Sequence, residues 1–169
     1  MPEVLVVLDS GSLDRIGDQL ARQLQPTEAI VNIDHHNTAT KFGDLNLIET
    51  GASSTAEIIY RLIEASGMEM GPERALCLYT GLMFDTGCFR YSNSTSVAHR
   101  IAADLIEEGI SVDEVYRFVY DTVPQVRLHL LGDVLQTLET TEDAKIAWLS
   151  VTQDVLKENG ASSNNLEGF

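Results

Sequence analysis

The chain has few basic residues. Its 169 residues include 11 lysines and arginines against 26 aspartates and glutamates, for a formal net charge of −15, and the bases nowhere form a run. A protein that binds duplex DNA needs a basic patch to neutralise phosphates, so we expect no duplex DNA partner. If the chain acts on phosphates, metal ions or a second, basic domain must supply the positive charge. For most of the carboxylates we expect no role beyond solubility.

Cysteines and long apolar runs are also scarce. Cys77 and Cys88 are eleven residues apart in apolar surroundings. This spacing fits no common zinc motif, so we expect two buried thiols. No segment approaches the roughly 20 apolar residues of a membrane-spanning helix, and the N-terminus has no basic-then-apolar signal. We therefore expect no membrane partner and a cytoplasmic location.

Apolar runs and helical patterns alternate along the chain, which is typical of an α/β fold. The runs "EVLVVLD" at residues 3–9 and "EAIVNID" at residues 28–34 predict buried parallel strands. Residues 13–24 between them have the apolar spacing of a helix. We expect a parallel sheet flanked by helices on both faces.

Later helices are marked by their ends. Ser54 and Glu57 form a capping box, and Gly67 ends that helix. Pro72 opens the next helix, and Asp85 is expected just past its end. The buried stripe of the first of these helices is predicted as Ile58, Ile59, Leu62 and Ile63.

The C-terminal part has a predicted helix at residues 123–139 and a late strand at 145–152. The tail is rich in Gly, Ser and Asn, so we assign residues 1–155 to the domain and residues 156–169 to the start of a linker.

Acidic and histidine residues follow the predicted strands. Asp9 ends the first strand, Asp34, His35 and His36 end the second, and Asp85 follows a helix. Ligands bind outside the carboxyl ends of parallel strands, so these segments can converge on one crevice. Carboxylates and imidazoles without thiolates suit Mn²⁺, Mg²⁺ or Co²⁺.

Each of these residues also has a structural explanation. An Asp at a strand end is often a turn or cap residue, and a His there is commonly structural. Adjacent side chains on an extended chain point in different directions, so His35 and His36 cannot easily bind one ion together. One of them could bind metal while the other faces the substrate.

Three segments together resemble the DHH phosphoesterase superfamily. They are "VVLDSGSLDRIG", "VNIDHHNT" and "YTGLMFDTGCFRYSNSTS", in the family's order and spacing. The resemblance is strongest to the oligoribonuclease and 3'-phosphoadenosine-5'-phosphate (pAp) phosphatase subgroup. It implies a DHH catalytic domain with a two-metal site, most often manganese.

The resemblance also implies roles for individual residues. Asp9 would bridge two metals, and His35 and Asp85 would each bind the second metal. His36 would face the scissile phosphate. Asp34 would support the histidines by accepting a hydrogen bond.

Weaker candidates surround these residues. Arg90 could bind a phosphate through two hydrogen bonds or form a surface salt bridge, and the two alternatives weigh equally. Asn93 is expected in a turn. For the Ser53–Thr55 segment we favour helix capping over anion binding. His99 and His129 are expected to be incidental.

The chain also departs from the family pattern. No His-x-x-x-Asp-x-Asp motif precedes Asp9, and the family's smaller C-terminal domain has no counterpart. We therefore expect a fragment whose sheet is incomplete at its N-terminus, with exposed strand edges that favour association such as a homodimer. We expect at most weak binding of one metal and little catalysis by this chain alone.

Hydrolysis of short oligoribonucleotides or pAp is the leading hypothesis for function. The alternatives are a cyclic-dinucleotide phosphodiesterase, a manganese-type pyrophosphatase of the same superfamily, and an inactive metal- or nucleotide-binding remnant.

Overall fold

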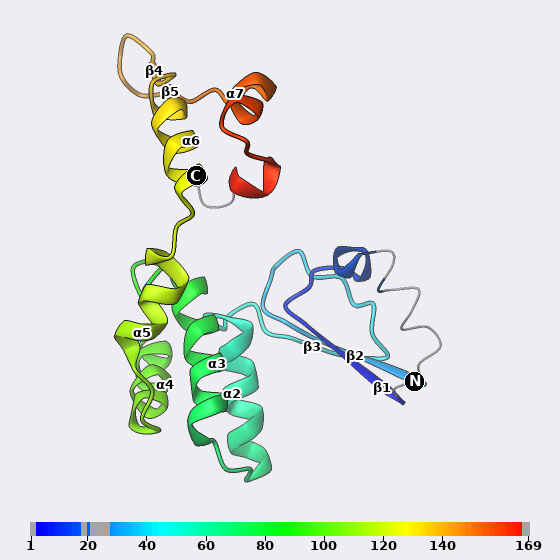
Figure 1. The fold of residues 1–169 in the computed structure, drawn as a ribbon. Coiled ribbons are helices and arrows are strands. Elements are labelled where there is room, and N and C mark those ends of the chain that lie inside the picture. Colours follow the sequence, from blue (N-terminus) through cyan, green and yellow to red (C-terminus); the bar gives the residue numbers. More distant parts are fainter. Residues whose placement is uncertain (1–2, 18–19, 21–27, 167–169) are drawn as a thin grey trace. The chain divides into compact units, whose positions relative to one another are not determined.

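The computed structural model describes residues 3–17, residue 20 and residues 28–166 (Figure 1). It divides the chain into two compact units, Met1–Val115 and Tyr116–Phe169. Every residue that the sequence predicts for the site lies in the first unit.

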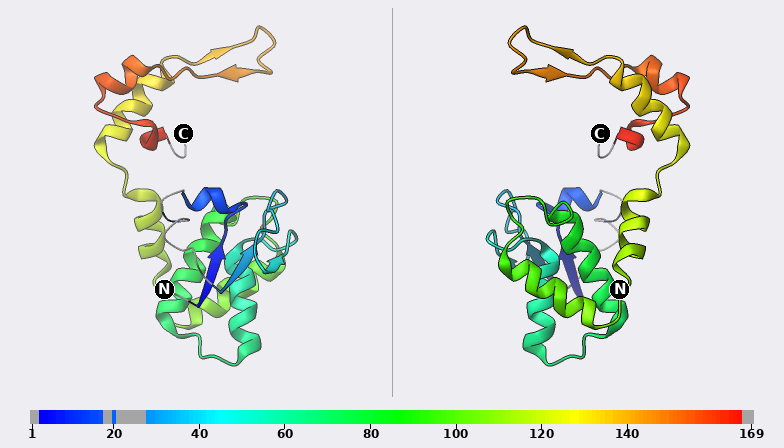
Figure 2. Two further views of the ribbon diagram at one scale, coloured as in Figure 1. Left: turned by 90° about the vertical axis from the view of Figure 1, so that its right-hand side faces the viewer. Right: turned by 90° about the vertical axis from the view of Figure 1, so that its left-hand side faces the viewer.

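A parallel sheet with the strand order β1-β2-β3 forms one layer of the first unit (Figure 2). Its strands are β1 (Val4–Leu8), β2 (Ala29–Asp34) and β3 (Leu45–Ile48). Leu8 pairs with Ile33, and Ile33 with Leu47, so the three strands end at the same edge. The two predicted strands and the α/β class are confirmed. β3 was not predicted, because four residues are too few to show a period.

Half of the helix predicted at residues 13–24, namely residues 18, 19 and 21–24, lies outside the described residues. Its first turn is the 3₁₀ helix η1 (Leu13–Ile16). On β1, the side chains of Val4, Val6 and Leu8 are about half exposed, and the strand pairs with β2 alone among the described residues. That the sheet lacks an upstream strand stays a prediction.

Helix α2 (Thr55–Ser66) packs on the sheet through Ile58, which forms an apolar cluster with Ile33 and Ala52. The predicted cap is confirmed at Ser54, whose hydroxyl accepts a hydrogen bond from Glu57 N. The Glu57 carboxylate accepts from Ser53 N at 2.9 Å, one residue before the N-cap, rather than from Ser54 N as in a regular capping box. The predicted C-cap, Gly67, is left-handed with φ 69°.

The predicted buried stripe of α2 is too wide. Ile58 and Ile63 are buried, but the side chain of Leu62 is 41 % exposed, so its assignment to the core is wrong. The sheet and helix α3 (Gly71–Asp85) cover a narrower face of α2 than the stripe assumes.

Helix α3 packs between α2 and α4 (Ser96–Glu107), and Leu82 and Leu105 are fully buried in these layers. Pro72 opens α3 as predicted, and Asp85 is its last residue rather than the residue beyond its end. The expectation of two buried thiols is wrong. Cys77 is exposed on the side of α3 that lines a cleft, and Cys88 is half-buried.

Among the described residues, no helix combines the length and apolarity that crossing a membrane requires.

The segment from α5 (Val112–Tyr116) through the π-helical η2 (Arg117–Asp121) crosses the boundary between the two units. The second unit then contains α6 (Gln125–Leu135), the antiparallel pair β4 (Glu139–Thr140) and β5 (Ala147–Trp148), α7 (Gln153–Glu158) and η3 (Ser163–Leu166).

Leu130 and Val134 of α6 and Leu156 of α7 form the core of this unit. The late strand predicted at residues 145–152 is present as the two residues of β5. The predicted domain boundary after residue 155 falls within α7, and the linker assignment stays a prediction.

The connection from β2 to β3 carries the two histidines and returns through Gly43. The Asn46 side chain binds both the N–H and the carbonyl of Gly43. A Cβ added at Gly43 would lie 2.8 Å from Leu45 O and 2.9 Å from Ile30 O, both backbone atoms. This position therefore requires glycine because the backbone approaches closely.

We predict that Gly43→Ala lowers the free energy of unfolding by about 1–3 kcal/mol, because strand backbone must move to admit the methyl group. Urea unfolding followed by circular dichroism measures this loss. The matched control is Gly51→Ala, since a Cβ at Gly51 meets nothing within 4 Å. We expect the control to stay within about 0.5 kcal/mol of wild type. Equal losses in the two variants would contradict the steric argument.

Candidate metal centre

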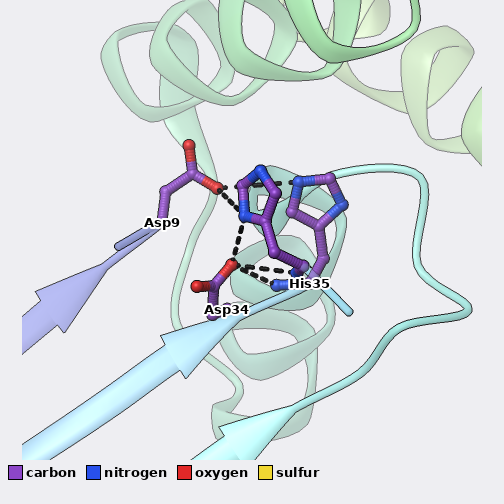
Figure 3. A group of neighbouring side chains, drawn as sticks. Asp9, Asp34 and His35 are labelled. Carbon is purple, nitrogen blue, oxygen red and sulfur yellow. Dashed lines mark hydrogen bonds and ion pairs between the residues drawn. The ribbon is translucent and has the colours of Figure 1, made fainter. Parts of the chain in front are cut away.

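The carboxyl ends of β1 and β2 and the last turn of α3 bring the predicted site residues together. Asp9 follows β1, Asp34 ends β2, and His35 and His36 come directly after it (Figure 3). Asp9 has a φ of 56°, a left-handed backbone that non-glycine residues adopt at a cost. This conformation turns the chain out of β1 at the point where its carboxylate meets His35.

His35 lies between two carboxylates. Its Nε2 atom is 3.6 Å from Asp9 Oδ1 and 3.5 Å from Asp85 Oδ2, and its side chain is 14 % exposed. This nitrogen is buried and has no hydrogen-bond partner within the described part of the chain. Its other nitrogen, Nδ1, lies 3.4 Å from Ala52 O.

Asp34 is fully buried, and its Oδ1 atom is a shared acceptor. It accepts hydrogen bonds from His35 N at 2.6 Å and His36 N at 3.0 Å, and it lies 2.7 Å from His36 Nδ1. Burial by itself raises the pKa of the Asp34 carboxyl, but these hydrogen bonds outweigh it and hold the pKa below its usual range. Asp34 is therefore a charged group that fixes the backbone and one ring of the histidine pair.

The two histidines have different surroundings. The side chain of His36 is 42 % exposed, against 14 % for His35, and its Nδ1 lies 3.7 Å from Asp9 Oδ1. The two rings are tilted by 59° with centroids 4.4 Å apart. His35 faces into the acidic cluster, whereas His36 is accessible to solvent.

The surroundings of Asp85 destabilise the charged form of its carboxylate. Burial and then the negative charge of Asp9 raise the pKa of the Asp85 carboxyl, while His35 and His36 act in the opposite direction. Two carboxylates on either side of one imidazole repel each other, and a cation between them removes that cost.

These residues fit a divalent metal ion. Ligand atoms of Asp9, Asp34, His35 and His36 lie within 4.8 Å of one another, and Asp85 adds a carboxylate beside His35. Two ligands each about 2.1 Å from one ion are separated by about 3.0–3.5 Å, close to the distances around His35 Nε2. Oxygen and imidazole donors without thiolates suit a hard or borderline cation. Asp9, His35 and Asp85 could hold such an ion.

An apolar cleft of about 690 Å³ opens beside the cluster, between β1, α2 and α3. Asp9, Thr55 and Asp85 lie on its wall together with apolar side chains such as Leu8 and Phe84. The acidic groups therefore border a concave surface, as expected for a ligand site.

The weaker candidates lie as follows. Arg90 is exposed, and its Nε donates to Gly87 O at 2.9 Å, so the structure uses it in the turn after Asp85. Of the Ser53–Thr55 segment, Ser54 is the helix cap, as expected. His99 contacts Ser94 and Phe89, and His129 contacts Gln125.

Two residues have contacts that sequence reasoning missed. The Thr55 hydroxyl donates to Asp9 Oδ1 at 2.8 Å. Asn93 does lie in a turn, but its Nδ2 also donates to Ser53 O and Asp85 O. Asn93 lies inside a segment that resembles the family, whereas the only sequence signal for Thr55 is its position at the predicted start of a helix.

Comparison with known proteins identifies the first part of the chain. Residues 1–82 match the DHH family, N-terminal domain. The bifunctional oligoribonuclease and PAP phosphatase NrnA of Thermus thermophilus is 34 % identical over 135 residues, covering 79 % of this chain and 40 % of that protein. Its counterpart in Bacillus subtilis is 30 % identical over 165 residues, covering 95 % and 51 %. The chain thus spans about half the length of the curated relatives it matches.

Two solved structures resemble this chain in fold. The crystal structure of an exopolyphosphatase-related protein from Bacteroides fragilis superposes with a TM-score of 0.86 at 32 % identity, covering 98 % of this chain and 49 % of that one. A putative family II inorganic pyrophosphatase from Methanococcus jannaschii reaches a TM-score of 0.57 at 18 % identity, covering 85 % and 50 %, which shows a shared fold alone.

The resemblance noted in the sequence is thereby confirmed for residues 1–82, which match the DHH family and carry Asp9 and the Asp34-His35-His36 motif.

Proposed function

We propose that the chain is the metal-binding part of a phosphoesterase that hydrolyses short oligoribonucleotides or pAp. The observation that carries this proposal is the buried Nε2 of His35, which faces Asp9 and Asp85 and has no hydrogen-bond partner in the described part of the chain. The substrate class rests on relatives named bifunctional oligoribonuclease and PAP phosphatase at 30–34 % identity.

Asp9, His35 and Asp85 bind a divalent cation, with Mn²⁺ expected ahead of Mg²⁺ or Co²⁺. Such a cation supplies Lewis-acid stabilisation of negative charge on phosphoryl oxygens and lowers the pKa of water. Asp34 holds the His36 ring through Nδ1, which leaves Nε2 as the nitrogen that can face a phosphate, and in the imidazolium form, in which both ring nitrogens carry a proton, Nε2 can donate to it. His36 thereby stabilises charge that develops on the phosphate.

The charge distribution supports a small, metal-neutralised substrate. With a net charge of −15, the chain repels a long phosphate backbone, whereas a nucleotide with one or two phosphates needs only a local cation. Arg90, five residues after Asp85, is the candidate for substrate binding. To bind a phosphate, its guanidinium must give up the hydrogen bond that Nε donates to Gly87 O. We expect this activity in the cytoplasm, and we expect the chain to form homodimers.

We predict that the chain binds Mn²⁺ and that Asp9→Asn, His35→Ala and Asp85→Asn each raise the dissociation constant at least about tenfold, because each removes a ligand. Isothermal titration calorimetry measures the affinities. Asp104→Asn is the matched control, since this α4 carboxylate lies outside the cluster and binds Tyr60. Wild-type affinity in all three site variants would remove the basis of the proposal.

For catalysis we predict little or no turnover of pAp or of 5'-phosphorylated diribonucleotides by this chain alone in Mn²⁺. The reason is that Asp9, His35 and Asp85 can hold one ion, whereas the family site holds two. Release of inorganic phosphate and of mononucleotides measures turnover, with pyrophosphate as the comparison substrate. Robust turnover would contradict this prediction and show that a site with one metal ion is enough for catalysis. Preferential cleavage of pyrophosphate would contradict the proposed substrate class.

Asp34 gives a separate prediction about stability. We expect Asp34→Ala to lower the free energy of unfolding by about 2–4 kcal/mol, because His35 N and His36 N lose their acceptor in a buried site. Thermal or urea unfolding without metal measures the loss.

Asp44→Ala is the control for this experiment. Its carboxylate accepts one hydrogen bond from Ile30 N at an exposed position, so we expect a loss of about 1 kcal/mol or less. If Asp34→Ala cost no more than Asp44→Ala, Asp34 would not be the support that the geometry describes.

A further inference from the structure

The segment Ala52–Thr55, which leads into α2, is connected to all three proposed metal ligands. The four residues are buried. The ligands come from three different places in the sequence, at residues 9, 35 and 85. One short segment that contacts each of them can fix their relative positions.

Thr55 makes the contact with Asp9. Its hydroxyl donates to Asp9 Oδ1 at 2.8 Å, and its side chain is 5 % exposed. Helix capping does not explain this hydroxyl, because Ser54 is the residue whose side chain accepts from Glu57 N. The bond restrains a carboxylate whose own backbone is in the left-handed region.

Asn93 connects the same segment to Asp85. Its Nδ2 donates to Ser53 O at 2.9 Å and to Asp85 O at 3.0 Å, so one amide group joins the segment to the end of α3. Ser53 is held further by Thr95, whose Oγ1 lies 3.2 Å from Ser53 Oγ, and by Glu57, which accepts from Ser53 N.

Ala52 supplies the contact with the imidazole. Its carbonyl lies 3.4 Å from His35 Nδ1, and a carbonyl can only accept. This contact favours the tautomer in which Nδ1 carries the proton and Nε2, the nitrogen between Asp9 and Asp85, has its lone pair available.

We propose that Thr55 and Asn93 are positioning residues that, through the Ala52–Thr55 segment, hold Asp9 and Asp85 around His35 in the arrangement that binds a divalent cation. The proposal rests on the proposed function, because it assumes that these three residues bind metal. It assigns to the start of α2 a role that neither helix capping nor a surface turn requires.

The test compares Mn²⁺ affinity with metal-free stability in the full chain. Thr55→Val removes the hydroxyl at nearly constant volume, and we expect it to weaken Mn²⁺ binding by about tenfold. Its unfolding midpoint without metal should change by less than about 3 °C, which corresponds to about 1 kcal/mol. Thr55→Ser keeps the hydroxyl and should recover Mn²⁺ affinity to within about threefold of wild type.

Thr80→Val is the matched control. Its hydroxyl donates to Leu76 O within α3, so the substitution removes the same group without touching a ligand. We expect wild-type Mn²⁺ affinity. Asn93→Ala is the second variant, with an expected loss of affinity similar to that of Thr55→Val, and it tests the proposal if Thr55→Val does not fold.

The outcomes separate this inference from the proposed function. If wild type binds Mn²⁺ and both Thr55→Val and Asn93→Ala bind it equally well, the positioning role is wrong and the metal site stands. A Thr55→Ser variant as weak as Thr55→Val would also overturn it, since the hydroxyl would not be the group that matters. If wild type binds no Mn²⁺, the proposed function and this inference fail together.

Discussion

The candidate site depends on one electrostatic constraint, which is that Asp9 and Asp85 must remain on either side of His35 although their charges repel. Burial, and after it the negative charge of Asp9, raises the pKa of the Asp85 carboxyl. Asp34 avoids the same penalty because three hydrogen-bond donors satisfy its Oδ1 atom. The neighbouring structure must therefore hold Asp9 and Asp85 in place, and it does so through groups outside the cluster.

The residues of the cluster could be predicted from sequence, but most of the contacts that hold them could not. Two apolar runs that each end in Asp predicted where Asp9 and Asp34 lie, because parallel strands end at a common edge. The Thr55–Asp9 bond joins residues 46 apart in sequence, and the Asn93–Ser53 bond joins residues 40 apart. Such bonds depend on how α2 and α3 pack, which no local pattern encodes. The expectation that Leu62 and Cys77 are buried was wrong for a related reason. An apolar sequence pattern does not show which side of a helix its neighbours cover.

The turn after Asp85 illustrates how backbone conformation serves the site. Gly87, Cys88 and Phe89 are three consecutive residues with positive φ, and two of them have side chains that disfavour it. A Cβ at Gly87 would overlap the Tyr91 ring, so the chain must fold tightly here. This reversal brings Asn93 back against Asp85 O. The turn, with its unfavourable backbone angles, thus positions the Asn93 amide that links α3 to the start of α2.

Strain and repulsion at the site must be offset by packing elsewhere, because native proteins have little stability to spare. Asp9 has an unfavourable backbone, and the buried Asp34 Oδ2 and His35 Nε2 have no hydrogen-bond partner within the described residues. The fully buried Leu82 and Leu105 stabilise the helical layer from which Asp85 projects. A cation that binds Asp9, His35 and Asp85 relieves the repulsion between the carboxylates and gives His35 Nε2 a partner. The relief of this repulsion adds to the free energy of metal binding. The same rigidity that makes the cluster costly therefore favours metal binding once an ion is present.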